Sequence, residues 1–67
     1  MAGKREQQKQ EKKQSLLTAA RELFIENGVA KTSIDQIASR AQVAKGTFYL
    51  YFRDKEDLLQ ALIYRIS

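Results

Sequence analysis

The chain has 67 residues, which is enough for one small domain, and it contains neither cysteine nor histidine. Without cysteine there is no disulfide or thiolate metal site, and without histidine the commonest general base and metal ligand is missing. No apolar run approaches the roughly 18 residues that span a bilayer, and the polar N-terminus lacks the apolar core of a signal peptide. Composition therefore argues against a redox enzyme, a zinc module and a membrane protein, and we expect a cytoplasmic protein without a cofactor.

Residues 1–13 form a basic, polar arm that is predicted to be flexible. The segment holds five basic and two acidic side chains, which is +3 of the net charge of +4. Met1 is its only large apolar residue, so the arm has nothing to bury, although it could extend the helix that follows. Such an arm suits a polyanion such as DNA, but a purely solubilising tail would have the same composition.

The first helix is expected from about Gln14 to Asn27. Apolar side chains recur there at steps of three and four residues, which places them on one face of a helix. This stripe consists of Leu16, Leu17, Ala20, Leu23 and Phe24. Gly28 is predicted to end the helix, because glycine adopts the left-handed conformation of a helix C-cap at little cost.

The second helix is expected to start at Ser33. Ser33 and Gln36 have the spacing of a capping box, in which each side chain bonds the backbone amide of the other residue. The apolar face of this helix consists of Ile34, Ile37, Ala38 and Ala41. A helix of about two turns does not form alone in water, so it must pack on the first helix.

The third helix, from Lys45 to Phe52, follows a tight turn. Two short helices that are joined by such a turn and braced by a longer helix describe a helix-turn-helix unit. The sequence therefore predicts an all-α fold, with a three-helix, homeodomain-like helix-turn-helix bundle in residues 14–53 and the start of a fourth helix after it. In such units the second short helix enters the major groove of DNA with its N-terminal residues near the base edges.

The fourth helix is expected to begin at the N-cap Asp54 and to continue through Ile66. Glu56 and Asp57 in its first turn suit the helix dipole, which explains this acidic group more simply than a metal site does. The helix is still amphipathic at the end of the chain. Residues 54–67 are therefore expected to lead toward a larger C-terminal domain that the sequence does not include.

The faces of the third helix follow from its turn of about 100° per residue. Phe48 and Phe52 are one turn apart and are predicted to point into the core. The opposite face shows Gly46, Thr47 and Leu50, while Tyr49 and Tyr51 fall on the two flanks.

This helix carries the residue types that DNA recognition needs. Lys45 adds a positive charge, and Thr47 can bond a base edge while its methyl group touches the methyl of thymine. A tyrosine hydroxyl at the edge of the groove can bond a phosphate oxygen. Gly46 leaves room for the start of the helix to approach the DNA backbone. Leu50 could meet a thymine methyl or be an ordinary exposed leucine.

A longer series of residues has the order and spacing of a known family. The chain resembles the TetR family of transcriptional regulators over nearly its whole length apart from the arm. The matching residues are Ala20, Leu23, Phe24, Gly28, Thr32-Ser33-Ile34, Ile37-Ala38, Ala41-Gln42-Val43, Lys45-Gly46-Thr47-Phe48-Tyr49, Tyr51-Phe52, Lys55-Glu56 and Leu58-Leu59.

The resemblance implies a three-helix DNA-binding domain, followed in the family by a helical domain that dimerises and binds a small inducer. It thus implies a ligand-responsive repressor that binds double-stranded DNA as a homodimer, on a palindromic operator. Carried over by position, Thr32 and Ser33 are phosphate contacts and Lys55 contacts the DNA backbone. The recognition-helix contacts are Lys45, Gly46, Thr47, Tyr49 and Tyr51.

Two residues depart from the family's pattern. Gln42 stands where the family commonly has glycine, and a side chain in a left-handed turn costs roughly 1 kcal/mol. Ala44 stands where serine or threonine is common, so the third helix loses a hydroxyl cap that contributes ~1 kcal/mol. Both departures affect stability and one phosphate contact, but not the fold.

Two alternatives to DNA binding remain. A helix-turn-helix fold can serve protein–protein contacts alone, since fold does not dictate function, but the basic arm and the polar residues of the third helix argue against this use. An enzyme is not expected, because the sequence offers no nucleophile–base pair, metal-ligand cluster or phosphate-cradling glycine loop.

Overall fold

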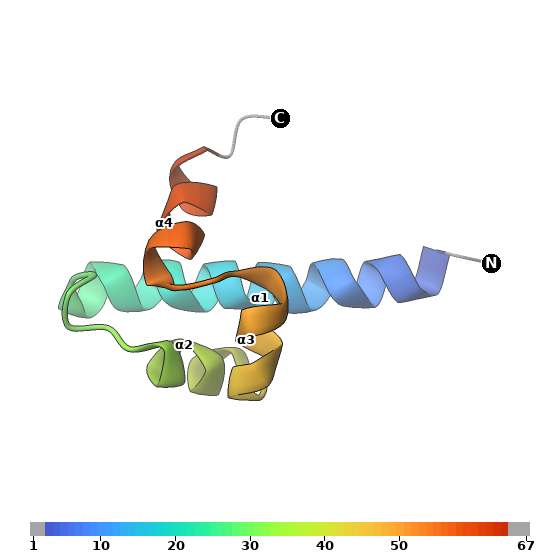
Figure 1. The fold of residues 1–67 in the computed structure, drawn as a ribbon, viewed down its shortest axis with the longest axis horizontal. Coiled ribbons are helices and arrows are strands. Elements are labelled where there is room, and N and C mark those ends of the chain that lie inside the picture. Colours follow the sequence, from blue (N-terminus) through green and yellow to red (C-terminus); the bar gives the residue numbers. More distant parts are fainter. Residues whose placement is uncertain (1–2, 65–67) are drawn as a thin grey trace.

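A computed structural model describes residues 3–64, which form four helices. They are α1 (Gly3–Asn27), α2 (Ile34–Ala41), α3 (Lys45–Tyr51) and α4 (Lys55–Ile63). Figure 1 shows α1 as a long rod with α2 and α3 on one side of it, while the end of α4 projects on the other side. This part of the chain has no strand, and the expected all-α bundle with the start of a fourth helix is confirmed.

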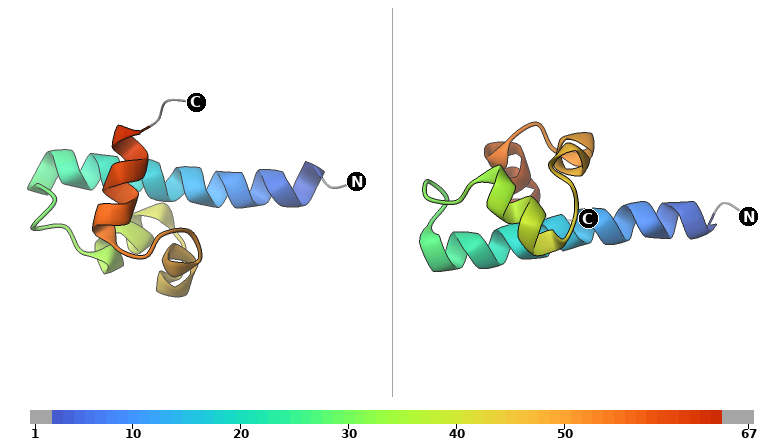
Figure 2. Two further views of the ribbon diagram at one scale, coloured as in Figure 1. Left: turned by 45° about the horizontal axis from the view of Figure 1, so that its top comes forward. Right: turned by 90° about the horizontal axis from the view of Figure 1, so that it is seen from below.

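The long helix α1 begins at Gly3, well before the expected start near Gln14. The basic arm therefore extends the first helix, which was one of its two expected forms (Figure 2). The inward stripe of α1 is buried and consists of Leu16, Ala19, Ala20 and Leu23. Leu17 and Phe24 lie at the edge of the stripe, half-buried against the core.

Hydrogen bonds at the ends of α1 and α2 follow the sequence pattern. Gly28 has a φ of 87°, and its amide donates to the carbonyl of Phe24 over 2.9 Å, so the predicted left-handed cap is confirmed. The amide of Gln36 donates to the Ser33 hydroxyl over 3.1 Å, and the Ser33 amide donates to Gln36 Oε1 over 3.0 Å. The predicted capping box is therefore complete.

The turn between α2 and α3 contains both departures from the family's pattern. Gln42 adopts a left-handed conformation, with φ 61° and ψ 41°. The next amide, that of Val43, donates to the carbonyl of Ala38 over 3.0 Å, which is the bond expected after a left-handed C-cap. Ala44 is the N-cap of α3 and makes no side-chain cap bond. Both expected losses of stability, from the left-handed Gln42 and from the missing hydroxyl cap at Ala44, are therefore present in the structure.

The core joins all four helices. Phe48 and Phe52 are buried, with ring centres 5.7 Å apart, and they pack with Ile37 of α2 and Leu58 of α4 against the stripe of α1. α3 ends at Tyr51, one residue earlier than expected, and Phe52 serves as its C-cap. The inward orientation predicted for the two phenylalanines is confirmed.

Two of the acidic residues near the start of α4 form capping bonds. Asp54 is the N-cap, and its Oδ1 accepts from the amide of Asp57 over 2.8 Å. Asp57 Oδ2 in turn accepts from the amide of Arg53 over 2.9 Å. α4 ends at Ile63, and Ile66, which was expected in this helix, lies outside the described residues.

From Gly3 to Tyr64, no helix combines the length and the apolar character that crossing a membrane requires.

Candidate nucleic-acid interface

The outward face of α3 is open to solvent. Tyr49 is 51% exposed and Leu50 is 79% exposed, whereas Phe48 on the inward face is fully buried. The ring of Tyr49 meets the edge of the Phe48 ring at a centre-to-centre distance of 5.5 Å. This contact fixes the base of the Tyr49 side chain while its outer part stays accessible to a partner.

The first turn of α3 carries a positively charged side chain, a glycine and a hydroxyl group. Lys45 is exposed, and its Nζ lies 3.2 Å from Oδ1 of Asp35 in the first turn of α2. A Cβ atom added at Gly46 would meet no atom within 4 Å, so nothing inside this part of the protein requires glycine there. Thr47 is half-buried and follows Gly46 on the same turn.

The two tyrosines of α3 differ in environment, although the sequence placed them symmetrically on the flanks. Tyr51 is half-buried and packs against the hydrophobic core. Tyr49 is exposed and packs mainly on one ring. Tyr49 is therefore the freer of the two to contact a partner, and Tyr51 also supports the position of α3.

Thr32 and Ser33, which were paired as phosphate contacts, have opposite environments. The Thr32 side chain is only 1% exposed, and its hydroxyl donates to the carbonyl of Gly28 over 2.8 Å and lies 3.3 Å from that of Leu23. The Thr32 hydroxyl is therefore engaged inside the fold, and the phosphate contact expected of Thr32 stays a prediction. Ser33 is exposed, and its hydroxyl accepts from Gln36 while its own proton remains free to donate.

Lys55 at the start of α4 is half-buried, and its Nζ donates to the carbonyl of Val29 over 2.9 Å. This bond ties the loop that precedes α2 to α4. An ammonium group has three N–H donors, so Lys55 can hold the loop and still face an anion.

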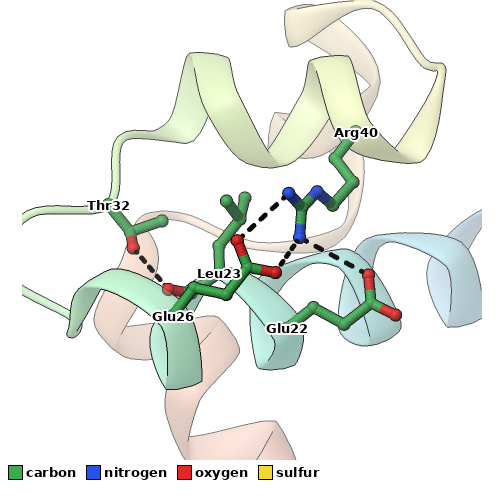
Figure 3. A network of polar contacts seen from close by, with 5 residues as sticks. All are labelled: Glu22, Leu23, Glu26, Thr32 and Arg40. Carbon is green, nitrogen blue, oxygen red and sulfur yellow. Dashed lines mark hydrogen bonds and ion pairs between the residues drawn. The ribbon is translucent and has the colours of Figure 1, made fainter.

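Arg40 fixes α2 to α1, and the sequence reading missed this role. Figure 3 shows its guanidinium reaching two carboxylates of α1. It bonds Glu26 over 2.8 and 3.3 Å, and it lies 3.7 Å from Glu22. The hydrogen bond from Arg40 lowers the pKa of Glu26, and the same bond raises the pKa of Arg40. Because α2 carries the turn and α3, this paired contact helps to set the direction of the exposed face.

Sequence reading also missed the pair between Asp35 and Lys45. Both of these contacts join residues of different helices, so no spacing within one helix indicates them. The only signal in the sequence is the presence of the charges themselves.

The fold and this exposed face define a helix-turn-helix domain of the DNA-binding class. Residues 16–62 match the family described as "Bacterial regulatory proteins, tetR family". The chain therefore belongs to the TetR family, as its resemblance implied.

Curated relatives agree with this assignment. The chain is 50% identical to the transposon Tn10 TetC protein of Escherichia coli over 48 residues, 72% of this chain and 24% of that protein. It is 42% identical to the HTH-type transcriptional regulator AcrR of Shigella flexneri over 62 residues, 92% of this chain and 29% of that protein. It is 46% identical to the fatty acid metabolism regulator protein of Bacillus subtilis over 55 residues, 82% of this chain and 28% of that protein. The chain thus spans about a quarter of the length of these relatives. No solved structure matches it.

Proposed function

We propose that the chain binds double-stranded DNA sequence-specifically by placing α3 in the major groove. One observation carries this proposal, namely the orientation of α3. Phe48 and Phe52 hold the helix on the core, which leaves Lys45 and Tyr49 exposed and Thr47 partly accessible. A helix of this width fits the major groove, where each base pair presents a distinct set of donors and acceptors.

The accessible side chains divide into base and phosphate contacts. Thr47 reads a base edge, since its hydroxyl can donate or accept and its methyl can touch thymine. Lys45, Ser33 and Tyr49 bond phosphates, which positions the helix without reading sequence. Gly46 adds no side chain between the helix and the DNA.

Three further residues act at the margin of this interface. Tyr51 contacts the DNA backbone through its hydroxyl, while its ring packs against the core. Lys55 contributes a backbone contact next to its bond to Val29. Thr32 is proposed to lie against the DNA backbone at the start of α2, where the bonds of its hydroxyl to the end of α1 hold it in place.

At the level of the whole protein, we propose a cytoplasmic, ligand-responsive repressor. A relative from Brucella suis, 38% identical over 55 residues, is described as the "HTH-type transcriptional repressor BepR". The proposed protein dimerises and binds a small inducer through a helical domain that follows residues 54–67. Two-fold symmetry would then require a palindromic operator.

The proposal is tested by selecting preferred sites from a pool of random duplexes with the wild-type protein and two variants. Thr47→Ala should change the preferred base at about one or two positions. Tyr49→Phe should weaken binding about fivefold on all sequences, because it removes one hydrogen bond to phosphate worth roughly 1 kcal/mol. Tyr64→Phe, which removes an exposed hydroxyl from the end of α4, is the matched control and should change neither property.

Two results would contradict the proposal. A change of sequence preference in Tyr49→Phe, with Thr47→Ala unchanged, would refute the assignment of base and phosphate contacts. A folded wild-type protein that binds no duplex at low salt would favour the alternative, a helix-turn-helix module that contacts only proteins.

A further inference from the structure

An acidic residue lies on the face that the proposed function turns toward DNA. Asp35 is in the first turn of α2 and Lys45 is the first residue of α3, and their charged atoms are 3.2 Å apart. Both side chains are more than half exposed, at 71% for Asp35 and 55% for Lys45. The pair therefore bridges the two helix starts at the surface, where a phosphate group would approach.

The cap of α2 does not need this carboxylate. An acidic residue in the first turn is favoured by the helix dipole, but Ser33 and Gln36 already supply both bonds of the capping box. The side chain of Asp35 reaches across to α3 instead. Its position is thus explained better by Lys45 than by the helix that carries it.

We propose that Asp35 competes with DNA for Lys45. In the free protein the Asp35 carboxylate pairs with the Lys45 ammonium group, and a DNA phosphate displaces the carboxylate on binding. This inference rests on the proposed function, because it assumes that α3 meets a duplex. The ammonium group of lysine is a compact point charge and lacks the planar, two-pronged donor geometry of arginine. Lys45 can therefore pair with a carboxylate oxygen or a phosphate oxygen from the same position.

The exposure of the pair makes the exchange possible. Exposed ion pairs in water are weak, since solvent screens both charges and the side chains are mobile. A phosphate from a polyanion can therefore replace Asp35. Arg40 differs, because it bonds Glu26 with both terminal nitrogens and has Glu22 beside it.

We expect this competition to lower the affinity of the protein for DNA of any sequence. Non-specific affinity for DNA comes almost entirely from cations that meet phosphates and release counterions. Asp35 weakens this contribution at Lys45, because the ammonium group is paired with its carboxylate. Removal of its charge should therefore tighten binding to any duplex, which is the opposite of what the loss of a structural residue would do.

The experiment is a double-mutant cycle of Asp35→Asn and Lys45→Gln, measured by fluorescence anisotropy on a labelled duplex of random sequence. Asp35→Asn should bind about three- to tenfold more tightly than wild type and should steepen the salt dependence by up to about one counterion. In the Lys45→Gln background, the same change should alter affinity less than about twofold. Glu11→Gln, which removes one negative charge from an exposed position on α1, is the control for net charge.

Several results would overturn the inference. Equal tightening by Asp35→Asn in both backgrounds, or equal tightening by Glu11→Gln, would mean general repulsion rather than competition for Lys45. Weaker binding by Asp35→Asn with an unchanged circular dichroism spectrum would make Asp35 a direct contact. If Asp35→Asn does not fold, Asp35→Ser replaces it, because serine is tolerated near a helix N-terminus. A wild-type protein that binds DNA while Lys45→Gln has no effect would refute this inference and the phosphate contact of Lys45, but not the placement of α3 in the groove. No binding by wild type would refute the proposed function as a whole.

Discussion

At the scale of single residues, the turn between α2 and α3 requires a backbone conformation of Gln42 that is unfavourable in free energy. Gln42 has a φ of 61° and a ψ of 41°, and this left-handed conformation costs a residue with a side chain roughly 1 kcal/mol. The penalty is accepted because the turn brings Phe48 into the core beside Ile37. Packing of α3 therefore decides the conformation of a residue whose own preference is different.

Gln42→Gly should raise the free energy of unfolding by up to about 1 kcal/mol, because glycine removes this strain. The greater freedom of glycine in the unfolded chain offsets part of the gain. Urea unfolding followed by circular dichroism measures the change. Gln60→Gly inside α4 is the control, and its free energy of unfolding should fall by about 1 kcal/mol. A destabilised Gln42→Gly would mean that contacts of the Gln42 side chain outweigh the strain.

At the scale of elements, the position of α2 on α1 depends on a polar clamp as well as on apolar packing. Arg40 bonds Glu26 across a separation of 14 residues in the chain. Thr32 adds a second tie, since its hydroxyl bonds the last turn of α1. Both contacts are present in the protein without DNA. They help to fix the orientation of α3 and do not contribute to sequence recognition.

The contribution of Glu26 to stability should depend on pH. Arg40 lowers the pKa of Glu26 in the folded state, so the folded protein binds a proton there less readily than the unfolded chain. The stabilisation is fully present above the ordinary glutamate pKa of about 4.3 and is lost as the pH falls through the lowered pKa. Thermal unfolding of wild type and Glu26→Gln should therefore differ at neutral pH and converge in acid.

The same comparison in an Arg40→Gln background is the control. Without the guanidinium, Glu26→Gln should produce no difference that follows pH. A difference that persists unchanged in acid would instead assign the effect of Glu26 to packing.

At the scale of the whole molecule, binding should be strongly salt-dependent. Lys45 and Lys55 are both proposed to contact phosphates, and every cation that meets a phosphate releases counterions. The logarithm of the binding constant should fall with the logarithm of salt concentration with a slope near −2 per half-site, or roughly −4 for a dimer. Anisotropy titrations over a range of salt concentrations measure this slope, and an affinity that stays flat would contradict a phosphate-based interface.

The matched variant for this prediction is Lys45→Gln, whose slope should be shallower by about one counterion. Arg21→Gln removes a charge from an exposed residue of α1 that lies in the groove with Leu62 of α4, and its slope should equal that of wild type.

The local features of this protein were readable from its sequence. The apolar stripe of α1, the left-handed cap at Gly28, the capping box at Ser33 and the inward pair Phe48 and Phe52 all follow from preferences that act within about one helical turn. The helix-turn-helix pattern then indicated the recognition helix, and the family resemblance supplied its expected contact residues. These features determine which segments are helices and which faces they bury.

Only the tertiary structure decided which partners the polar side chains meet on other helices and loops. It buried Thr32 against Leu23, nine residues away, and bonded Lys55 to Val29, 26 residues away. It also paired Asp35 with Lys45 across two helix starts. The physical reason is range: caps and periodicity act between near neighbours, whereas these contacts exist only after packing has brought separate helices together.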